Sequence, residues 1–380
     1  MVNPLEPSAA RPGSPARRNA ALDGLRGIAI AMVLWHHLVE LNLPPGRGSW
    51  LGWLRAGTGL SWSGVDLFFT LSGFFIGGIL IDRRESPRLT RVFYLRRAVR
   101  ILPIYYITLG FIAVALLARL PGSFHLFPPW VYALFLTNFA LGLAQRWDWI
   151  PLSVLWSISV EEQFYLTAPW VVRALPPSRL PWFLAGLAVL AELARAAVLI
   201  WHPQGNLALH VLTPFRMDAL ALGAWVAWAV RSDAAHPFFD GLRSAWKLWL
   251  ASGLVLLCGL ALLRPAEGSP VMALAGYPLM ASVFALAVAI LSGLRPPGLS
   301  RFLESRPLVH LGRHSYFIYL WHTLLGGALI RWLGGPNFIL NSPHTLGVVL
   351  LAVAATWIAA AASWKWLEGP LVAWGHQHAY

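Results

Sequence analysis

The sequence predicts an all-α protein: a polytopic bundle of helices embedded in a membrane. Of its 380 residues, 57% are hydrophobic and only 12% are charged, whereas soluble domains carry about 25% charged residues. Long apolar runs recur along most of the chain, as membrane spans require. Tryptophan is abundant, at 21 residues, and aromatic belts at the two membrane surfaces would use some of them.

A membrane-spanning helix needs about 20 mainly apolar residues. The expected apolar segments cover residues 25–43, 62–81, 99–119, 131–144, 152–174, 181–201, 211–230, 246–263, 271–293, 314–333 and 345–366.

The distribution of Lys and Arg orients these segments, because cytoplasmic loops carry an excess of both. The basic connections, expected inside, are residues 82–100, 231–247 and 295–313. The connections without Lys or Arg, expected outside, are residues 120–130, 201–210 and 334–344.

If all eleven segments crossed the membrane, the basic connection 231–247 would lie outside. Ten crossings put every basic connection inside, with both termini cytoplasmic. Residues 131–144 are too short to cross at about 1.5 Å per residue. We therefore expect them to form a re-entrant or interfacial piece and residues 152–174 to span.

One membrane domain, residues 21–370, is expected between two short tails. Residues 1–20 lack the apolar core of a signal peptide and predict a disordered cytoplasmic tail, and residues 371–380 predict a second cytoplasmic tail. The single cysteine, Cys258, excludes an internal disulfide and is expected to be a buried packing residue. The net charge of +13 follows from the basic loops and not from nucleic-acid binding.

Polar residues inside apolar segments are candidate functional residues, because burying a charge in a membrane costs at least about 2.5–3.5 kcal/mol. In the first segment, "LDGLRGIAIAMVLWHH", Arg26 and His37 are eleven residues apart. On a regular α-helix this spacing puts both on one stripe, about 16 Å apart along the axis, and turns His36 aside by about 100°. The alternative for either histidine is a structural hydrogen bond to a neighbouring helix.

Two arginines in "FYLRRAVRILPIYY", Arg97 and Arg100, are three residues apart and should share one helix face, while Arg96 points elsewhere. Their guanidinium groups suit phosphate binding, or they anchor the helix at the cytoplasmic surface. In "WSISVEEQFYL", Glu161 and Glu162 lie near the middle of a predicted span. At least one should face the protein interior, with a basic partner or with a role at the site.

Three further motifs place polar groups at membrane depth. Asp66 lies near the outer end of its segment, which continues through Ser72 and Gly73, small residues that permit close helix approach. Arg216 and Asp218 would either pair locally or hold a polar acceptor.

Tyr316, Tyr319 and His322 form a stripe of polar aromatic residues, with Tyr319 and His322 neighbouring on one face. Such a stripe either forms structural hydrogen bonds between helices or is part of a functional site. No metal-binding pattern appears in the sequence, so no metal ion and no permanently bound cofactor is expected.

Six motifs in order resemble the acyltransferase-3 family of bacterial integral-membrane O-acyltransferases over residues 21–370. These motifs are "LDGLRGIAIAMVLWHH", "VDLFFTLSGFFIGG", "FYLRRAVRILPIYY", "WSISVEEQFYL", "RMDALALG" and "SYFIYLWH". The resemblance implies a multi-pass protein of the bacterial cytoplasmic membrane. It would move an acyl group, often acetyl, from acyl-coenzyme A to a hydroxyl of a carbohydrate or a glycosylated natural product, such as a surface polysaccharide or a macrolide sugar.

By this resemblance His37 is the catalytic histidine, as general base or acyl carrier, with Arg26 as its partner. Glu161 is the family glutamate and the second catalytic candidate. Arg26, Arg97 and Arg100 would bind the donor. The acceptor or oxyanion candidates are Asp66, Glu162, Arg216, Asp218, Tyr319 and His322. Direct transfer and a covalent acyl-histidine relay are both open. The alternative readings are a transporter of a polar or sugar-containing solute, and a membrane scaffold without activity.

Overall fold

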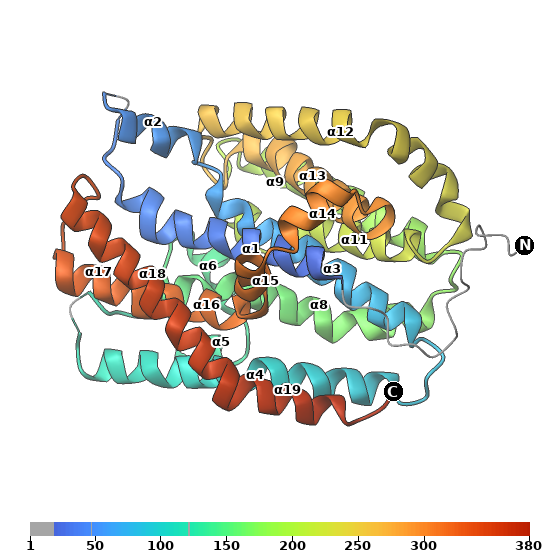
Figure 1. Cartoon of the computed structure of the whole chain (residues 1–380), viewed down its shortest axis with the longest axis horizontal. Coiled ribbons are helices and arrows are strands. Elements are labelled where there is room, and N and C mark those ends of the chain that lie inside the picture. The colour runs from blue at the N-terminus through green and yellow to red at the C-terminus, as the bar shows by residue number, and fades with distance from the viewer. Residues whose placement is uncertain (1–18, 47, 121) are drawn as a thin grey trace, which may run out of the picture.

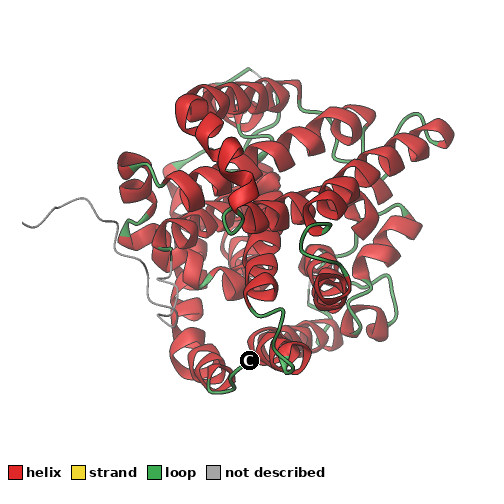
Figure 2. Ribbon diagram, turned by 90° about the vertical axis from the view of Figure 1, so that its right-hand side faces the viewer, coloured by secondary structure: helices red, strands yellow, loops and turns green. Residues whose placement is uncertain are grey.

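The computed structural model describes residues 19–46, 48–120 and 122–380. This part of the chain is helical and contains no β-strand (Figure 2), so the predicted all-α class is confirmed. The tail predicted over residues 1–20 lies outside the described residues except for Asn19 and Ala20. Asn19 caps the first helix, because its side-chain oxygen accepts a hydrogen bond of 3.2 Å from the Ala21 amide.

The described helices follow one another with short connections. In chain order they are α1 (Ala20–Leu34), α2 (Trp50–Gly57), α3 (Gly64–Asp82), α4 (Leu89–Leu117), α5 (Pro129–Ala133), α6 (Thr137–Ala144), α7 (Ile150–Ser153), α8 (Leu155–Ala174), α9 (Leu180–Trp201), α10 (Ala208–Val211), α11 (Thr213–Ala229), α12 (His236–Leu263), α13 (Tyr277–Ala289), α14 (Pro297–Leu303), α15 (Arg306–Arg313), α16 (Ser315–Trp321), α17 (Gly327–Gly334), α18 (Pro343–Ser363) and α19 (Gly369–His376). Turns of π-helix extend or join several of them, at Trp35–Val39, Met272–Gly276, Ile290–Leu294, His322–Gly326 and Trp364–Glu368.

Seven helical segments among the described residues are long and apolar enough to cross a membrane. They are Ala20–Asn42, Trp50–Asp82, Leu89–Leu117, Leu180–Trp201, Asp233–Leu263, Met272–Leu294 and Pro343–His376. The 20-residue α8 and the 17-residue α11 run beside them but carry buried charges. Ten crossings therefore remain a prediction, while the polytopic architecture is confirmed.

The segment expected to be re-entrant or interfacial, residues 131–144, is broken in two. Helices α5 and α6 are five and eight residues long, far below the length of a membrane span. Phe135, between them, has a φ of 56°, a left-handed conformation that ends a helical run. Helix α7 ends at Ser153 and α8 begins at Leu155, so the predicted segment 152–174 is helical but interrupted at Val154. It is not among the seven apolar segments, and its crossing stays a prediction.

The long helices lie roughly parallel to one another, with α12 and α4 on opposite edges and α1 and α3 between them (Figure 1). The start of α4 and the end of α19 lie together at one end of the bundle, on the right of Figure 1. We call this the arginine-rich end, from Arg83, Arg84, Arg88, Arg91 and Arg96 in and beside the α3–α4 connection. At the opposite end the Leu340 amide donates a hydrogen bond of 2.7 Å to the Asn42 carbonyl.

Glycines permit a close contact between α3 and α11. A Cβ atom on Gly73 of α3 would lie 2.0 Å from the Leu220 carbonyl oxygen of α11, and one on Gly223 of α11 would lie 2.0 Å from the Thr70 carbonyl oxygen of α3. The two backbones therefore touch, which confirms the close approach predicted at Gly73. This contact positions the neighbouring Ser72.

The expectation that Cys258 is buried is wrong, since it is exposed on α12. An apolar run in a membrane protein identifies residues that avoid water, and lipid satisfies this requirement as well as a protein core does.

The predicted tail over residues 371–380 includes the last part of α19. Its main chain contacts α4, where Arg96 donates a hydrogen bond of 2.6 Å to the His378 carbonyl.

Candidate functional site

A cavity of about 790 Å³, its open mouth included, lies between α1, α3, α4, α8 and α16. Each of these elements contributes polar groups at membrane depth. Six of the eleven candidate catalytic, donor-binding and acceptor residues line the cavity: Arg26, Arg97, Arg100, Glu161, Glu162 and Tyr319.

The arginines enter the cavity near the arginine-rich end. Arg97 and Arg100 both line it, as their spacing on α4 predicts. The predicted divergence of Arg96 is also confirmed, because its guanidinium lies over the Tyr380 ring at 4.6 Å, away from the cavity. Arg26 reaches the cavity from the second turn of α1 and lies 5.9 Å from the Phe75 ring centroid.

The carboxylates of α8 face these cations. Glu161 accepts a hydrogen bond from the Ser72 hydroxyl, and Ser72 in turn accepts one of 3.1 Å from Tyr165. Arg26 and Arg97 both lie within electrostatic range of Glu161. Glu162 Oε1 is buried without a hydrogen-bond partner among the described residues. A cavity that holds cations, carboxylates and an unpartnered oxygen is equipped to bind a polar ligand.

The far wall of the cavity is a tyrosine–serine pair. The Tyr319 hydroxyl lies 2.6 Å from Ser157 Oγ and donates to the Val154 carbonyl at 3.1 Å. Tyr316, on the same helix, donates a hydrogen bond of 3.0 Å to the Ile101 carbonyl of α4. The Tyr319 ring also contacts His322, with 5.8 Å between ring centroids. Tyr319 therefore separates the cavity from the histidines behind it.

His37 and His322 are in direct ring contact, with centroids 4.7 Å apart. Each lies in a π-helical turn, Trp35–Val39 or His322–Gly326. Turns of this kind change the hydrogen-bond register of a helix and are frequent at functional sites. His37 Nδ1 lies 3.1 Å from the Val33 carbonyl oxygen, and His322 Nδ1 lies 2.6 Å from the Tyr319 carbonyl oxygen.

These contacts define the tautomers. A carbonyl oxygen can only accept a hydrogen bond, so Nδ1 carries the proton in both neutral rings and Nε2 carries the lone pair. His322 Nε2 is buried without a hydrogen-bond partner in the described part of the chain. Two imidazole rings with unprotonated Nε2 atoms therefore meet behind Tyr319, available for a proton or an acyl group.

The predicted stripe of Arg26 and His37 needs correction. The arithmetic assumes a regular α-helix, but α1 ends at Leu34 and the π turn begins at Trp35. Arg26 lines the cavity, whereas His37 does not and instead contacts His322. Glu161 does not orient His37 either, because its side-chain partner is Ser72 and the Val33 carbonyl orients the ring.

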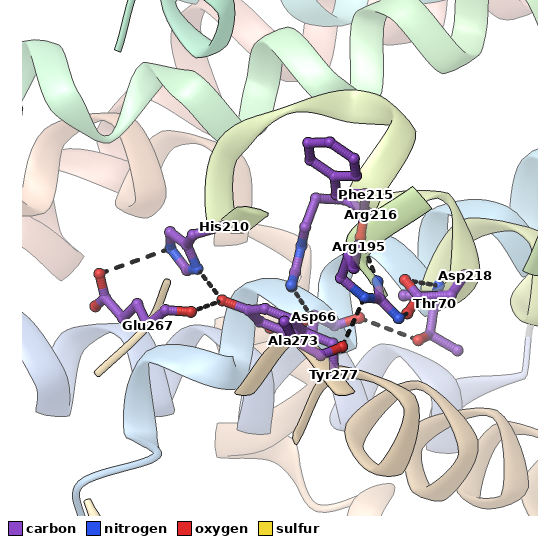
Figure 3. A network of polar contacts seen from close by, with 11 residues as sticks. Asp66, Thr70, Arg195, His210, Phe215, Arg216, Asp218, Glu267, Ala273 and Tyr277 are labelled. Atoms are coloured by element: carbon purple, nitrogen blue, oxygen red, sulfur yellow. Dashed lines mark hydrogen bonds and ion pairs between the residues drawn. The ribbon is translucent and has the colours of Figure 1, made fainter. Parts of the chain in front are cut away.

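Asp66, Arg216 and Asp218 belong to a different region, drawn in Figure 3. Arg216 and Asp218 do not pair with each other: Arg216 pairs with Asp66 of α3, and Asp218 pairs with Arg195 of α9 at 2.8 Å. On a helix, residues two apart point about 200° away from each other, so local pairing of 216 and 218 is disfavoured. None of these residues lines the cavity.

Sequence reasoning missed Ser157 and Tyr165 as cavity residues and treated Ser72 only as a small packing residue. A signal was present in "SISVEE", where Ser157 precedes Glu161 by four residues and must share its helix face. No such signal joins Ser72 to Glu161, which are 89 residues apart. In the described residues, no group of three His, Cys, Asp or Glu side chains could hold a metal ion.

Known proteins and protein families resemble this chain over most of its length. A model described as an acyltransferase domain matches residues 19–364. Over 92% of its length the chain is 26% identical to peptidoglycan O-acetyltransferase OatA of Listeria monocytogenes, covering 55% of that protein. It is 24% identical to O-acetyltransferase OatA of Staphylococcus aureus, covering 56%, and 27% identical to putative peptidoglycan O-acetyltransferase YrhL of Bacillus subtilis, covering 54%.

The chain thus spans about half the length of the curated relatives it matches. No solved structure matches it.

Proposed function

This chain belongs to the acyltransferase-3 family, and we propose that it transfers an acetyl group from acetyl-coenzyme A to a hydroxyl of a carbohydrate acceptor in a bacterial membrane. The names of the relatives, peptidoglycan O-acetyltransferase and O-acetyltransferase, support the acetyl group and a cell-wall glycan as the acceptor class. The observation that carries the proposal is the cavity of arginines and glutamates that ends at Tyr319, with His37 and His322 directly behind it.

The arginine-rich end would face the cytoplasm, where acyl-coenzyme A is found, as the excess of Arg in the α3–α4 connection favours. Arg97 and Arg100 would hold the phosphate groups of the donor, since guanidinium and phosphate form strong paired hydrogen bonds. The flexible arm of the donor would then pass along the cavity toward Tyr319. Eleven residues separate Arg26 from His37, about 16 Å at helical rise, a length that such an arm can bridge.

At the far end, His37 would act as the general base that removes the acceptor proton, or as the carrier that takes up the acyl group first. Both roles need a neutral imidazole with a free lone pair on Nε2. The Val33 carbonyl favours this tautomer, because it accepts a hydrogen bond from Nδ1. The His322 ring contacts that of His37, and the Tyr319 carbonyl favours the same tautomer in His322 by accepting a hydrogen bond from its Nδ1. The Tyr319 hydroxyl would stabilise the oxyanion after leaving its bond to Val154.

The test is release of coenzyme A by purified protein supplied with acetyl-coenzyme A and a glycan acceptor. We expect wild-type protein to release free coenzyme A and to produce an O-acetylated glycan detectable by mass spectrometry. His37→Ala should lose at least about 100-fold of this rate, as removal of a base or nucleophile does, while still inserting into the membrane. Wild-type activity in His37→Ala would refute the assigned role.

A transporter of a polar or sugar-containing solute is the competing function, because a polar cavity among membrane helices suits transport as well. A transporter would move solute without consuming the thioester. Release of coenzyme A therefore separates the two functions in the same assay.

A further inference from the structure

A second polar cluster adjoins His37 on the side away from His322. His36 Nδ1 lies 3.1 Å from Glu40 Oε2, and the Ser61 hydroxyl donates to the same carboxylate oxygen at 2.5 Å. His36 also interacts electrostatically with His210 of α10 and with Glu267 in the connection after α12. We call these five residues, with Trp62, Trp147 and Trp156, the acidic–aromatic cluster.

Three indole rings surround His210 in this cluster. Its ring centroid lies 5.2 Å from that of Trp62, 5.8 Å from that of Trp147 and 4.7 Å from the nearest Trp156 ring. His210 Nδ1 is 2.7 Å from the Tyr277 hydroxyl, and its Nε2 is 3.9 Å from Glu267 Oε2. The latter distance exceeds that of a hydrogen bond, so the carboxylate of Glu267 retains capacity to accept one from a ligand. Figure 3 shows His210 and Glu267 together at one edge of the buried network.

The cluster is accessible from the end of the bundle opposite the arginine-rich end. The Glu267 side chain is 30% exposed and that of His36 is 13% exposed, and Trp147 is 40% exposed. Partial burial also raises the pKa of Glu267 above its usual value. A ligand can therefore reach Trp147 and Glu267 first and His36 beyond them.

His37 lies between this cluster and the cavity that would bind the donor, called the donor cavity below. Its ring is perpendicular to that of His36, with centroids 4.8 Å apart, and it touches His322 at 4.7 Å. His36 differs from His37 in what holds its Nδ1, because its partner is a carboxylate and not a carbonyl. A carboxylate at this position stabilises the imidazolium formed when Nε2 takes a proton. His36 with Glu40 is thus built as a base, and His37 is placed between this base and the donor.

We propose that the acidic–aromatic cluster binds the neutral, hydroxyl-bearing ring of the carbohydrate acceptor, and that His36, oriented by Glu40, accepts the proton of the reacting hydroxyl. This inference rests on the proposed function and divides its chemistry between two histidines. Glu267 offers an acceptor for sugar hydroxyls, and Trp147 offers an apolar face for the ring. The two carboxylates, Glu40 and Glu267, disfavour an anionic ligand, in contrast to the arginines of the donor cavity.

The reaction then has two balanced steps. His37 Nε2 attacks the thioester carbonyl carbon, the carbon–sulfur bond breaks, and coenzyme A leaves as a thiolate that takes a proton from water. The acceptor hydroxyl next attacks the acetyl carbon, its proton passes to His36 Nε2, and the bond between that carbon and His37 Nε2 breaks. His36 returns its proton to solvent. Acyl-coenzyme A and the alcohol have become the ester and free coenzyme A.

Two measurements test the proposal, with [14C]acetyl-coenzyme A as donor and chitopentaose, a neutral oligosaccharide, as acceptor probe. Titration of the probe into the protein without donor measures acceptor binding, and label on the probe measures transfer. We expect Trp147→Ala to weaken binding of the probe about tenfold or more. His36→Gln should bind the probe within about twofold of wild type and release one equivalent of coenzyme A, yet transfer at least about 100-fold more slowly.

His344→Gln is the matched control, since this exposed histidine lies at the same end of the bundle on the first turn of α18, far from the cluster in sequence. It should behave as wild type in both measurements. Normal transfer by His36→Gln, loss of its coenzyme A release, or binding of the probe that is indifferent to Trp147→Ala would each overturn the proposal. Binding that depends on Trp147, without any transfer by wild type, would retain the acceptor site and refute the proposed acetyl transfer.

Discussion

At the scale of single residues, the site is built from side chains whose partners lie far away in the sequence. Ser72 and Glu161 are joined by one hydrogen bond across 89 positions, and Ser157 and Tyr319 by another across 162. Each of these four side chains thus gains a partner that lowers the cost of its burial. In the described part of the chain, His322 Nε2 and Glu162 Oε1 are buried without a hydrogen-bond partner.

The arginines of the cavity give a first prediction at this scale. Arg97→Ala and Arg100→Ala should each raise the KM for acetyl-coenzyme A by about 10- to 100-fold, because a charge-assisted contact to phosphate contributes roughly 1.5–3 kcal/mol. The acceptor KM should change little. Steady-state kinetics with each substrate varied in turn would measure both constants.

Arg96→Ala provides the control for these variants. Arg96 is adjacent in sequence, but its side chain contacts the His378 carbonyl and the Tyr380 ring instead of the cavity. Its donor KM should match that of wild type. Donor constants that moved equally in all three variants would show a general effect of charge at this end of the bundle, and not a donor site.

At the scale of secondary-structure elements, the π turns decide which way the histidines face. A regular continuation of α1 would place His37 near the direction of Arg26, whereas the turn Trp35–Val39 brings it against His322. The second π turn, His322–Gly326, brings its first residue to the same point from the other side. Two interruptions of helical register thus create the ring contact on which the proposed chemistry depends.

Helix packing gives a prediction at this scale. Gly73→Ala should lower the free energy of unfolding by about 1–3 kcal/mol, because its Cβ would meet the Leu220 carbonyl of α11 and force the backbones apart. Activity should fall as well, since Ser72 would shift with α3 relative to its partner Glu161 on α8. Thermal unfolding of the detergent-solubilised protein measures the first effect.

Gly347→Ala is the matched control. This glycine lies inside α18, where an added Cβ meets no atom within 4 Å, and alanine favours a helix over glycine. Its unfolding midpoint should equal or exceed that of wild type. Equal losses in both variants would mean that an added methyl group anywhere on these helices lowers stability, and not the α3–α11 contact in particular.

At the scale of the whole molecule, buried ion pairs connect helices that are distant in the chain. Asp66 of α3 pairs with Arg216 of α11, and Arg195 of α9 pairs with Asp218 of α11. Arg216 also lies 3.8 Å from the Tyr277 ring centroid of α13. Together these contacts tie four helices around one polar centre (Figure 3). None of its ion-pair residues lines the cavity between α1, α3, α4, α8 and α16.

This arrangement predicts a stability effect. Arg216→Met should cost about 3–5 kcal/mol in the free energy of unfolding, because it leaves the carboxylate of Asp66 buried without its cation. The double variant Asp66→Asn/Arg216→Met should recover part of that loss, since it removes the stranded charge. Unfolding in detergent, followed by circular dichroism, compares the variants.

An exposed pair in the same protein supplies the reference. Arg243 and Asp240 lie 3.1 Å apart with side chains 71% and 68% exposed, so Arg243→Met should have no measurable effect. If the double variant were as unstable as Arg216→Met, the loss would arise from packing against Tyr277 and not from the unpaired carboxylate.

Much of the architecture could be predicted because bilayer thickness imposes a length and a composition on every spanning helix. The helical class, the short broken segment at residues 131–144 and the shared face of Arg97 and Arg100 all follow from local spacing. Motif order also identified the family, which the match over residues 19–364 confirms. Local pairing of Arg216 with Asp218, one of two alternatives from the sequence, is wrong, because the partner of Arg216 is Asp66, 150 residues away.

The sequence by itself determined which polar residues lie at membrane depth, since hydrophobic flanks alone identify them. Only the tertiary structure decided which of them meet. It placed Arg26, Arg97, Arg100 and Glu161 around one cavity and moved Asp66, Arg216 and Asp218 to another centre. It also turned His37 toward His322 through the π turn Trp35–Val39. A π turn changes the direction of the side chains that follow it, and a calculation with about 3.6 residues per turn does not detect it.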